Sequence, residues 1–221
     1  MNRLKRLAML LVLGGAMLAA APALATVILT FGESGSGNPI VGTRVGSTTT
    51  ISGTDVPITI TGIDAPLATP ITAFLNFTST SIGPAVSIMG FVIQRFSGMF
   101  SITNGSTNFL SGTFSDSIFG AGTSLTMTAS MPFGAVSFSS NVIPASELAS
   151  EQAIAFAFAN VIPGAGVIDG TLRSFTSSVA GTFSATPEGR QRQVSEPGSL
   201  ALIGLAAFGA LGFSRRKSRS R

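Results

Sequence analysis

The segment Ala153-Ile-Ala-Phe-Ala-Phe-Ala159 decides the fold class, because large and small side chains alternate along all seven of its residues. Successive side chains of a strand point to opposite faces of a sheet. Ile154, Phe156 and Phe158 would therefore share one face, and the alanines would share the other. The segment predicts a β-strand with one buried face.

The same alternation recurs along the rest of the chain, at residues 56–63, 71–78, 124–130 and 135–139. Turn-forming residues separate these stretches, at positions 32–39, 104–105, 120–122, 163–164 and 169–170. Only Ser146–Gln152 could form a short helix, and a loop is the alternative there. About ten short strands at this spacing predict an all-β domain, and they favour an antiparallel β-sandwich or jelly-roll-like domain over a closed sheet.

A four-residue repeat supports the all-β prediction. The pattern Gly-x-Phe-Ser occurs at residues 98–101, 112–115 and 181–184. The first two copies flank Asn104-Gly105, as expected for two strands of one hairpin. We expect each Gly to mark a bulge or a close backbone approach and each Phe to point into the core, since Phe is the only aromatic residue in the chain.

The composition excludes several classes of function. The 221 residues include no Cys, His, Trp or Tyr, which removes zinc fingers, haem and iron–sulfur sites and Ser-His-Asp catalysis. The net charge of +4 comes from the two ends, because residues 26–194 hold five basic and eight acidic residues, a net of −3. A nucleic-acid surface needs clustered Lys and Arg, so no nucleic-acid partner is expected.

Residues 1–25 have the pattern of a secretory signal peptide. Basic residues precede an apolar run from Leu7 to about Ala20, and small residues follow it. Ala23 and Ala25 would occupy the −3 and −1 positions, so signal peptidase would cut between Ala25 and Thr26. The alternative is an uncleaved membrane anchor.

The other end has three parts: a linker at residues 190–198, an apolar segment at 199–214 and an Arg-rich tail at 215–221. As a helix, the apolar segment would reach only about 22 Å, short of the ~30 Å hydrocarbon core of a membrane. Snorkelling of the neighbouring cations could supply part of the difference. By the positive-inside rule the tail would be cytoplasmic; its cations are Arg215, Arg216, Lys217, Arg219 and Arg221. A buried core helix is the alternative, but such a helix should be amphipathic.

This arrangement resembles the PEP-CTERM sorting signal, in which a short Pro-Glu-Pro motif precedes a hydrophobic helix and a basic tail. Glu196 and Pro197 match the motif, and Ser195 stands where the first Pro is usual. The resemblance implies export across the inner membrane of a Gram-negative bacterium and transient anchoring through residues 199–214. It also implies processing by an exosortase and a final place in the envelope or outside the cell. The tail is known too under an ice-binding C-terminal name, which does not itself imply that activity.

The central residues 26–189 predict no catalytic residue, cofactor or metal site. Glu147 and Glu151 would share a face if their segment were helical, like a glycosidase pair, but the alternative is a solvated pair on a surface turn. Four acids stand alone in separate predicted loops, without the ladder of ligands that calcium needs: Asp55, Asp64, Asp116 and Asp169. No Gly-x-Ser-x-Gly motif occurs, and the central residues hold no Lys or His to act as a base.

These features together predict a non-enzymatic, exported protein of the cell surface or of an exopolysaccharide-rich biofilm matrix. The alternative is a polysaccharide-binding module acting through the β domain. Sugar-binding modules commonly stack their ligands on Trp or Tyr, so Phe or polar side chains would have to serve here.

Overall fold

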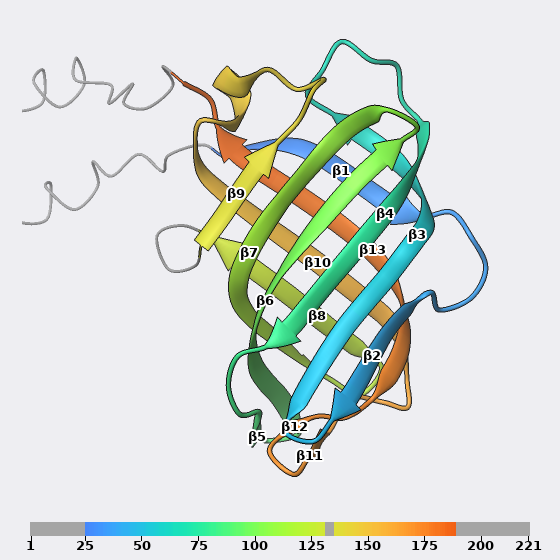
Figure 1. Cartoon of the computed structure of the whole chain (residues 1–221), viewed down its shortest axis with the longest axis vertical. Coiled ribbons are helices and arrows are strands. Elements are labelled where there is room, and N and C mark those ends of the chain that lie inside the picture. The colour runs from blue at the N-terminus through green and yellow to red at the C-terminus, as the bar shows by residue number, and fades with distance from the viewer. Residues whose placement is uncertain (1–24, 131–134, 189–221) are drawn as a thin grey trace, which may run out of the picture. The chain divides into compact units, whose positions relative to one another are not determined.

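The computed structural model describes residues 25–130 and 135–188, except for the side chains of Asp116 and Ser117 (Figure 1). The predicted signal peptide, linker, sorting helix and basic tail lie outside this range, apart from Ala25 at its edge. The described residues form a unit with its own core.

Nearly all of this unit is β-structure. Its strands are β1 (Thr26–Glu33), β2 (Ile40–Val45), β3 (Thr48–Ile63), β4 (Ile71–Ser81), β5 (Val86–Ile88), β6 (Phe91–Asn104), β7 (Thr107–Ala121), β8 (Ser124–Ser130), β9 (Ala135–Ser139), β10 (Ser150–Ile162), β11 (Val167–Ile168), β12 (Thr171–Leu172) and β13 (Phe175–Thr186). One turn of 3-10 helix, η1 (Ala145–Leu148), precedes β10. The prediction of an all-β, antiparallel domain is confirmed.

Eleven of the strands form a single antiparallel sheet that closes on itself. Its order runs β6-β4-β3-β1-β13-β10-β8-β7, and β7 pairs again with β6 to complete the circuit. β1 and β2 both lie between β3 and β13. Each of the two pairs with a different part of these longer strands. β8 and β9 likewise pair with different parts of the same edge of β7. Figure 1 shows the resulting front and back walls.

The expected two separate sheets of a sandwich are therefore one sheet. The reason is strand length: β3 has 16 residues, β6 has 14 and β7 has 15, so these strands continue past the short alternating stretches. Register shifts between Gly53 and Val56 in β3 and at Phe109 in β7, opposite Ile102 and Thr103, mark bulges, and bulges let a long strand bend. Closure also removes the free edges that a sandwich exposes.

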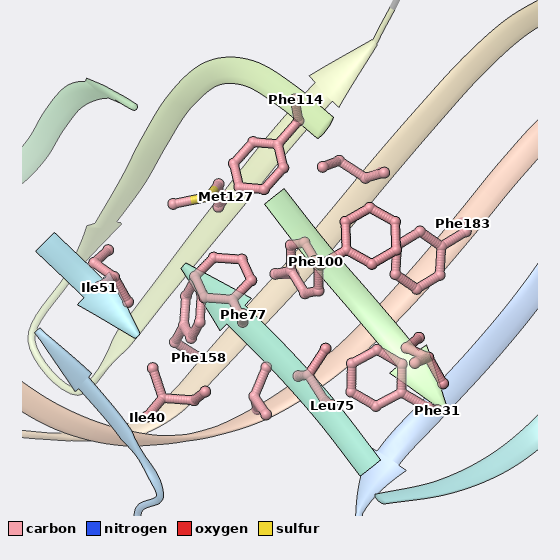
Figure 2. Packing of buried hydrophobic residues seen from close by; sticks show 14 of the residues in the cluster. Phe31, Ile40, Ile51, Leu75, Phe77, Phe100, Phe114, Met127, Phe158 and Phe183 are labelled. Carbon is pink, nitrogen blue, oxygen red and sulfur yellow. The ribbon is translucent and has the colours of Figure 1, made fainter. Parts of the chain in front are cut away.

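Phenylalanine rings fill the inside of the sheet (Figure 2). The ring of Phe156 lies 4.9 Å from that of Phe77 and 5.5 Å from that of Phe183, edge to face in both cases. Phe100 and Phe183 stack with their ring centroids 4.8 Å apart. Such pairs contribute about 0.5–1.5 kcal/mol each beyond the burial of their area. The rings occupy the space in which a wider closed sheet holds a ligand.

The repeat behaves as predicted. Phe100, Phe114 and Phe183 are buried, and the first two copies lie on the β6–β7 hairpin. Within that hairpin each Gly opposes the Phe of the other copy, since Gly98 pairs with Phe114 and Gly112 with Phe100. A Cβ added at Gly98 would lie 2.2 Å from the carbonyl oxygen of Thr78, so the glycine is needed for close strand approach.

Candidate functional site

The predicted sorting residues Ser195, Glu196 and Pro197, and the basic tail, lie outside the described residues, as does Ala23. The predicted cleavage point lies at the edge of the β unit. β1 begins at Thr26, which pairs with Ala185, and the Thr26 hydroxyl donates a hydrogen bond to the Ala185 carbonyl at 3.2 Å. Cleavage after Ala25 would thus leave every strand intact.

The structure does not pair Glu147 with Glu151, so the prediction of a helix over Ser146–Gln152 is wrong in its second half. The single turn η1 ends at Leu148, and β10 begins at Ser150. One helical turn is costly to nucleate, whereas pairing with β13 gives this segment ladder hydrogen bonds. The Glu151 carboxylate instead accepts a hydrogen bond from the Thr186 hydroxyl at 2.9 Å.

Asp55, Asp64 and Asp169 do not form a cation site in the part of the chain that the structure describes, and the Asp116 side chain lies outside that part. No three His, Cys, Asp or Glu residues gather there closely enough to hold a metal ion. The Asp55 carboxylate accepts a hydrogen bond from the Asn76 amide at 3.0 Å. The Asp169 carboxylate pairs with the Arg44 guanidinium at 2.6 Å. Asp55 lies within β3 and Asp116 within β7, so the expectation of four loop positions holds only for Asp64 and Asp169.

A buried polar network closes one end of the sheet, and the sequence analysis did not find it. The Gln94 side-chain amide donates to the Gly83 carbonyl at 2.8 Å and to the Thr171 hydroxyl at 2.9 Å. Its oxygen accepts the Leu172 N–H at 2.9 Å. The alternation of Val92, Gln94 and Phe96 could have placed Gln94 inside. Because the amide's hydrogen-bonding groups are used, the network holds the β11–β12 hairpin in place and has a structural role.

A shallow groove of about 490 Å³ crosses the outside of β4, β6, β7 and β9. Hydroxyl side chains dominate its lining, and the half-exposed side chain of Met99 lies among them. The hydroxyl-bearing residues are Thr78, Ser79, Thr80, Ser97, Thr113 and Ser115. The lining carries no charged residue, so the groove offers hydrogen-bond donors and acceptors without a general acid or base.

No helix within residues 25–130 and 135–188 is long and apolar enough to cross a membrane. The segment predicted to anchor the chain, residues 199–214, lies outside that range.

Comparison with known families bears on the C-terminal residues. The model of the PEP-CTERM protein-sorting motif matches residues 193–217. The chain carries a PEP-CTERM sorting motif. The match includes Ser195-Glu196-Pro197, the whole apolar segment and the first three cations of the tail, Arg215, Arg216 and Lys217.

The PEP-CTERM motif indicates an exported protein that is anchored transiently in the membrane and recognised by an exosortase. A search of curated proteins found no match to the chain, and a search of solved structures found none either. The sorting motif thus identifies the export route, whereas the role of the β unit has to be argued from its own surface.

Proposed function

We propose that this chain is a non-enzymatic structural protein of the cell surface or extracellular matrix of a Gram-negative bacterium. A signal peptidase would remove residues 1–25, and an exosortase would process the PEP-CTERM tail. The proposal rests on one observation: the sorting motif and the folded β unit occupy separate segments of the chain. The sorting motif occupies residues 193–217, and residues 25–188 form a unit whose interior is filled by Phe rings.

Processing of the tail can be tested in the native host by measuring the mass of the mature C-terminus. A Glu196→Ala/Pro197→Ala variant should retain its tail, because it loses both residues that match the motif. Glu188→Ala is the matched control, since it removes an exposed carboxylate upstream of the matched segment and should be processed normally. A double variant with the wild-type mature end would contradict recognition through these two residues.

The non-enzymatic role is supported by the scattered acids of the β unit. Retaining glycosidases hold two carboxyl groups about 5–5.5 Å apart, and inverting ones about 6.5–9.5 Å apart. Here Asp55 pairs with Asn76, and Asp169 pairs with Arg44. Incubation of the exported protein with the host's own polysaccharide should release no reducing ends above a heat-treated control. Sustained release in proportion to protein concentration would contradict the proposal.

A second candidate function, polysaccharide binding, is favoured by the hydroxyl-lined groove. Thr78→Val/Thr113→Val removes two of its hydroxyl groups while keeping the side-chain shape. Thr182→Val is a matched control, because Thr182 is exposed on β13, away from the groove. Retention on the host polymer that the groove variant loses and the control keeps would support this function. No retention of the wild-type protein would rule it out for that polymer.

A further inference from the structure

Three neighbouring turns present apolar side chains at the end of the sheet that carries β5, β11 and β12 (Figure 1). Turns on a protein surface are usually built from Gly, Asn, Asp, Ser or Pro. Here Val45, at the β2–β3 turn, is 73% exposed, and Met89, in the β5–β6 turn, is 96% exposed. Ile168, at the β11–β12 turn, is 44% exposed. Isolated exposed apolar residues are ordinary, but a contiguous cluster marks an interaction surface.

Polar contacts hold the three turns side by side. The Arg44 guanidinium, next to Val45, pairs with the Asp169 carboxylate of the β11–β12 turn at 2.6 Å. The Ala85 N–H, just before β5, donates a hydrogen bond to the Gly170 carbonyl of the same turn at 2.7 Å. The exposed apolar residues at this end therefore belong to one surface. We call it the apolar tip, and its members are Val45, Val86, Ile88, Met89, Phe91, Phe119 and Ile168.

Two stacked rings extend the apolar tip onto the neighbouring wall of the sheet. The ring centroids of Phe91 and Phe119 lie 5.0 Å apart, and the ring planes differ by 7°. Ile88 pairs with Phe91 across β5 and β6, and cross-strand partners point to the same face of a sheet. The side chains of Phe91 and Phe119 remain 43% and 49% exposed. The wall beside the three turns is therefore apolar as well.

The backbone at the β5–β6 turn shows that folding alone does not explain Met89. Met89 has a φ of 52° and is followed by Gly90 at 85°, so both residues of the turn lie in the left-handed region. Asn, Asp or Gly is the usual first residue of such a turn, because other side chains are disfavoured there. Met89 is 96% exposed, so its side chain gains almost no burial within the chain. The turn presents an apolar side chain outward where a polar one would fit better.

Charged residues are divided between the two ends of the β unit. All the described arginines lie beside the apolar tip: Arg44, Arg95 and Arg173. The acids near them are Asp169 and, on the strand next to Arg95, Asp116, so three cations face two anions. The opposite end carries acids without a described cation; these are Asp64, Glu147, Glu151 and Glu188. An anionic partner is therefore attracted to the tip and repelled by the other end.

The outer face of β6 spaces apolar and basic groups at the distance that a membrane surface requires. Phe91, Ile93 and Arg95 share this face, because Val92 and Gln94 between them are buried. At about 3.4 Å per residue, Arg95 lies about 13 Å along the strand from Phe91. Amphipathic segments insert about 5–10 Å into the boundary between lipid headgroups and acyl chains. A tip inserted to that depth places the exposed Arg95 at the level of the lipid phosphates.

The chain's own apolar segment is a poor occupant of the tip. The β unit ends at Glu188, whose N–H donates to the Ser146 carbonyl in η1, at the end of the unit opposite β5 (Figure 1). Residues 189–198 span at most about 35 Å when fully extended. The 14 residues of β6, which run between the two ends, measure about 45 Å. The segment that begins at residue 199 therefore starts too far away.

We propose that the apolar tip inserts into the surface of a lipid bilayer that contains anionic lipids. The side chains of the three turns and the Phe91–Phe119 stack enter the boundary of the acyl chains, and the arginines contact the lipid phosphates. A protein partner would need a cavity that matches three projecting turns, whereas a fluid lipid surface adapts to them. The acids at the other end keep the unit oriented with its tip toward the lipid.

Flotation with lipid vesicles tests the insertion. Every residue of the core lies between positions 28 and 185, so a chain of residues 26–194 can be used without the apolar segment. It should float with vesicles made of equal parts phosphatidylglycerol and phosphatidylcholine. Met89→Asn should lower its partition coefficient about tenfold, because an apolar side chain leaves the inserted surface. The same variant should melt no lower than the wild type, since Asn suits the left-handed turn.

Two further variants separate the tip from the rest of the surface. Val27→Asn is the matched control, because Val27 is 57% exposed near the other end of the unit and should be neutral for flotation. Arg95→Gln should weaken binding about fivefold on the mixed vesicles and leave binding to pure phosphatidylcholine unchanged.

Three outcomes would overturn the proposal. The first is a wild-type chain that stays free of the mixed vesicles, and the second is a Met89→Asn chain that floats as well as Val27→Asn. The third is a wild-type dimer that forms without vesicle binding and that Met89→Asn dissolves, which would assign the tip to a second copy. None of these results depends on how the PEP-CTERM tail is processed, because the tested chain lacks the apolar segment.

Discussion

Replacing Gly98 by Ala should test the close approach that the repeat imposes on β4 and β6. An added Cβ would lie 2.2 Å from the Thr78 carbonyl oxygen and 2.7 Å from the Ser79 Cα. Both are backbone atoms, so no side-chain rotation relieves the collision. The two strands would have to separate by about 1 Å, which lengthens the neighbouring ladder hydrogen bonds beyond useful range.

The expected loss of stability follows from the hydrogen bonds that this separation weakens. Each ladder hydrogen bond contributes about 0.5–1.5 kcal/mol net, and two or three lie around the Ser79–Gly98 pair. We therefore expect Gly98→Ala to lower the free energy of unfolding by about 3 kcal/mol, in line with other overpacked sites. For a domain of this size the melting temperature should fall by about 6–12 °C.

Gly32→Ala is the matched control, because Gly32 also lies within a strand but has no atom within 4 Å of an added Cβ. It should be neutral or should stabilise by about 0.5–1 kcal/mol, since Ala restricts the unfolded chain. Urea denaturation of a chain of residues 26–194 measures both variants. If Gly98→Ala were as stable as Gly32→Ala, the close-approach explanation of the repeat would be refuted.

Two further predictions concern the core and the buried network. Phe183→Ala should lower the free energy of unfolding by about 3–5 kcal/mol, because the ring is fully buried and packs on Phe100 and Phe156. Urea denaturation measures this loss, and a loss below about 1 kcal/mol would contradict the packing. Gln94→Ala should increase hydrogen exchange at the Leu172 amide, because that N–H loses its acceptor; an unchanged rate would show that the network does not hold β12.

The strands that sequence predicts best are those whose alternation is unbroken. The stretch 124–130 coincides with β8, and the large residues of 153–159 are buried as expected. The first half of β3 escapes prediction because its inward positions break the apolar pattern. Thr49 is buried in the polar network, and Gly53 carries no side chain where Ile40 and Val56 already fill the space.

Closure of the sheet could not be predicted from the sequence, for a different reason. It depends on β6 pairing with both β4 and β7 and on bulges that bend strands between walls, and local alternation does not encode which strands meet. The sorting motif could be found because its order along the chain is itself the signal. The exposed stack of Phe91 on Phe119 could not be found, since the two rings are neighbours only after β6 and β7 have paired.

Few charges protect this protein from unwanted association, because residues 26–194 carry only five basic and eight acidic side chains. Closure of the sheet replaces charge as the safeguard, since a closed sheet has no long free edge on which another chain can add a strand. Within the eleven-stranded sheet only the ends of its path, β5 and β9, pair with a single described strand, and they have three and five residues respectively. The outer edge of β5 is covered in part, because the Ala85 N–H donates a hydrogen bond to the Gly170 carbonyl at 2.7 Å. These edges are short, so they offer little ladder for open-ended strand addition.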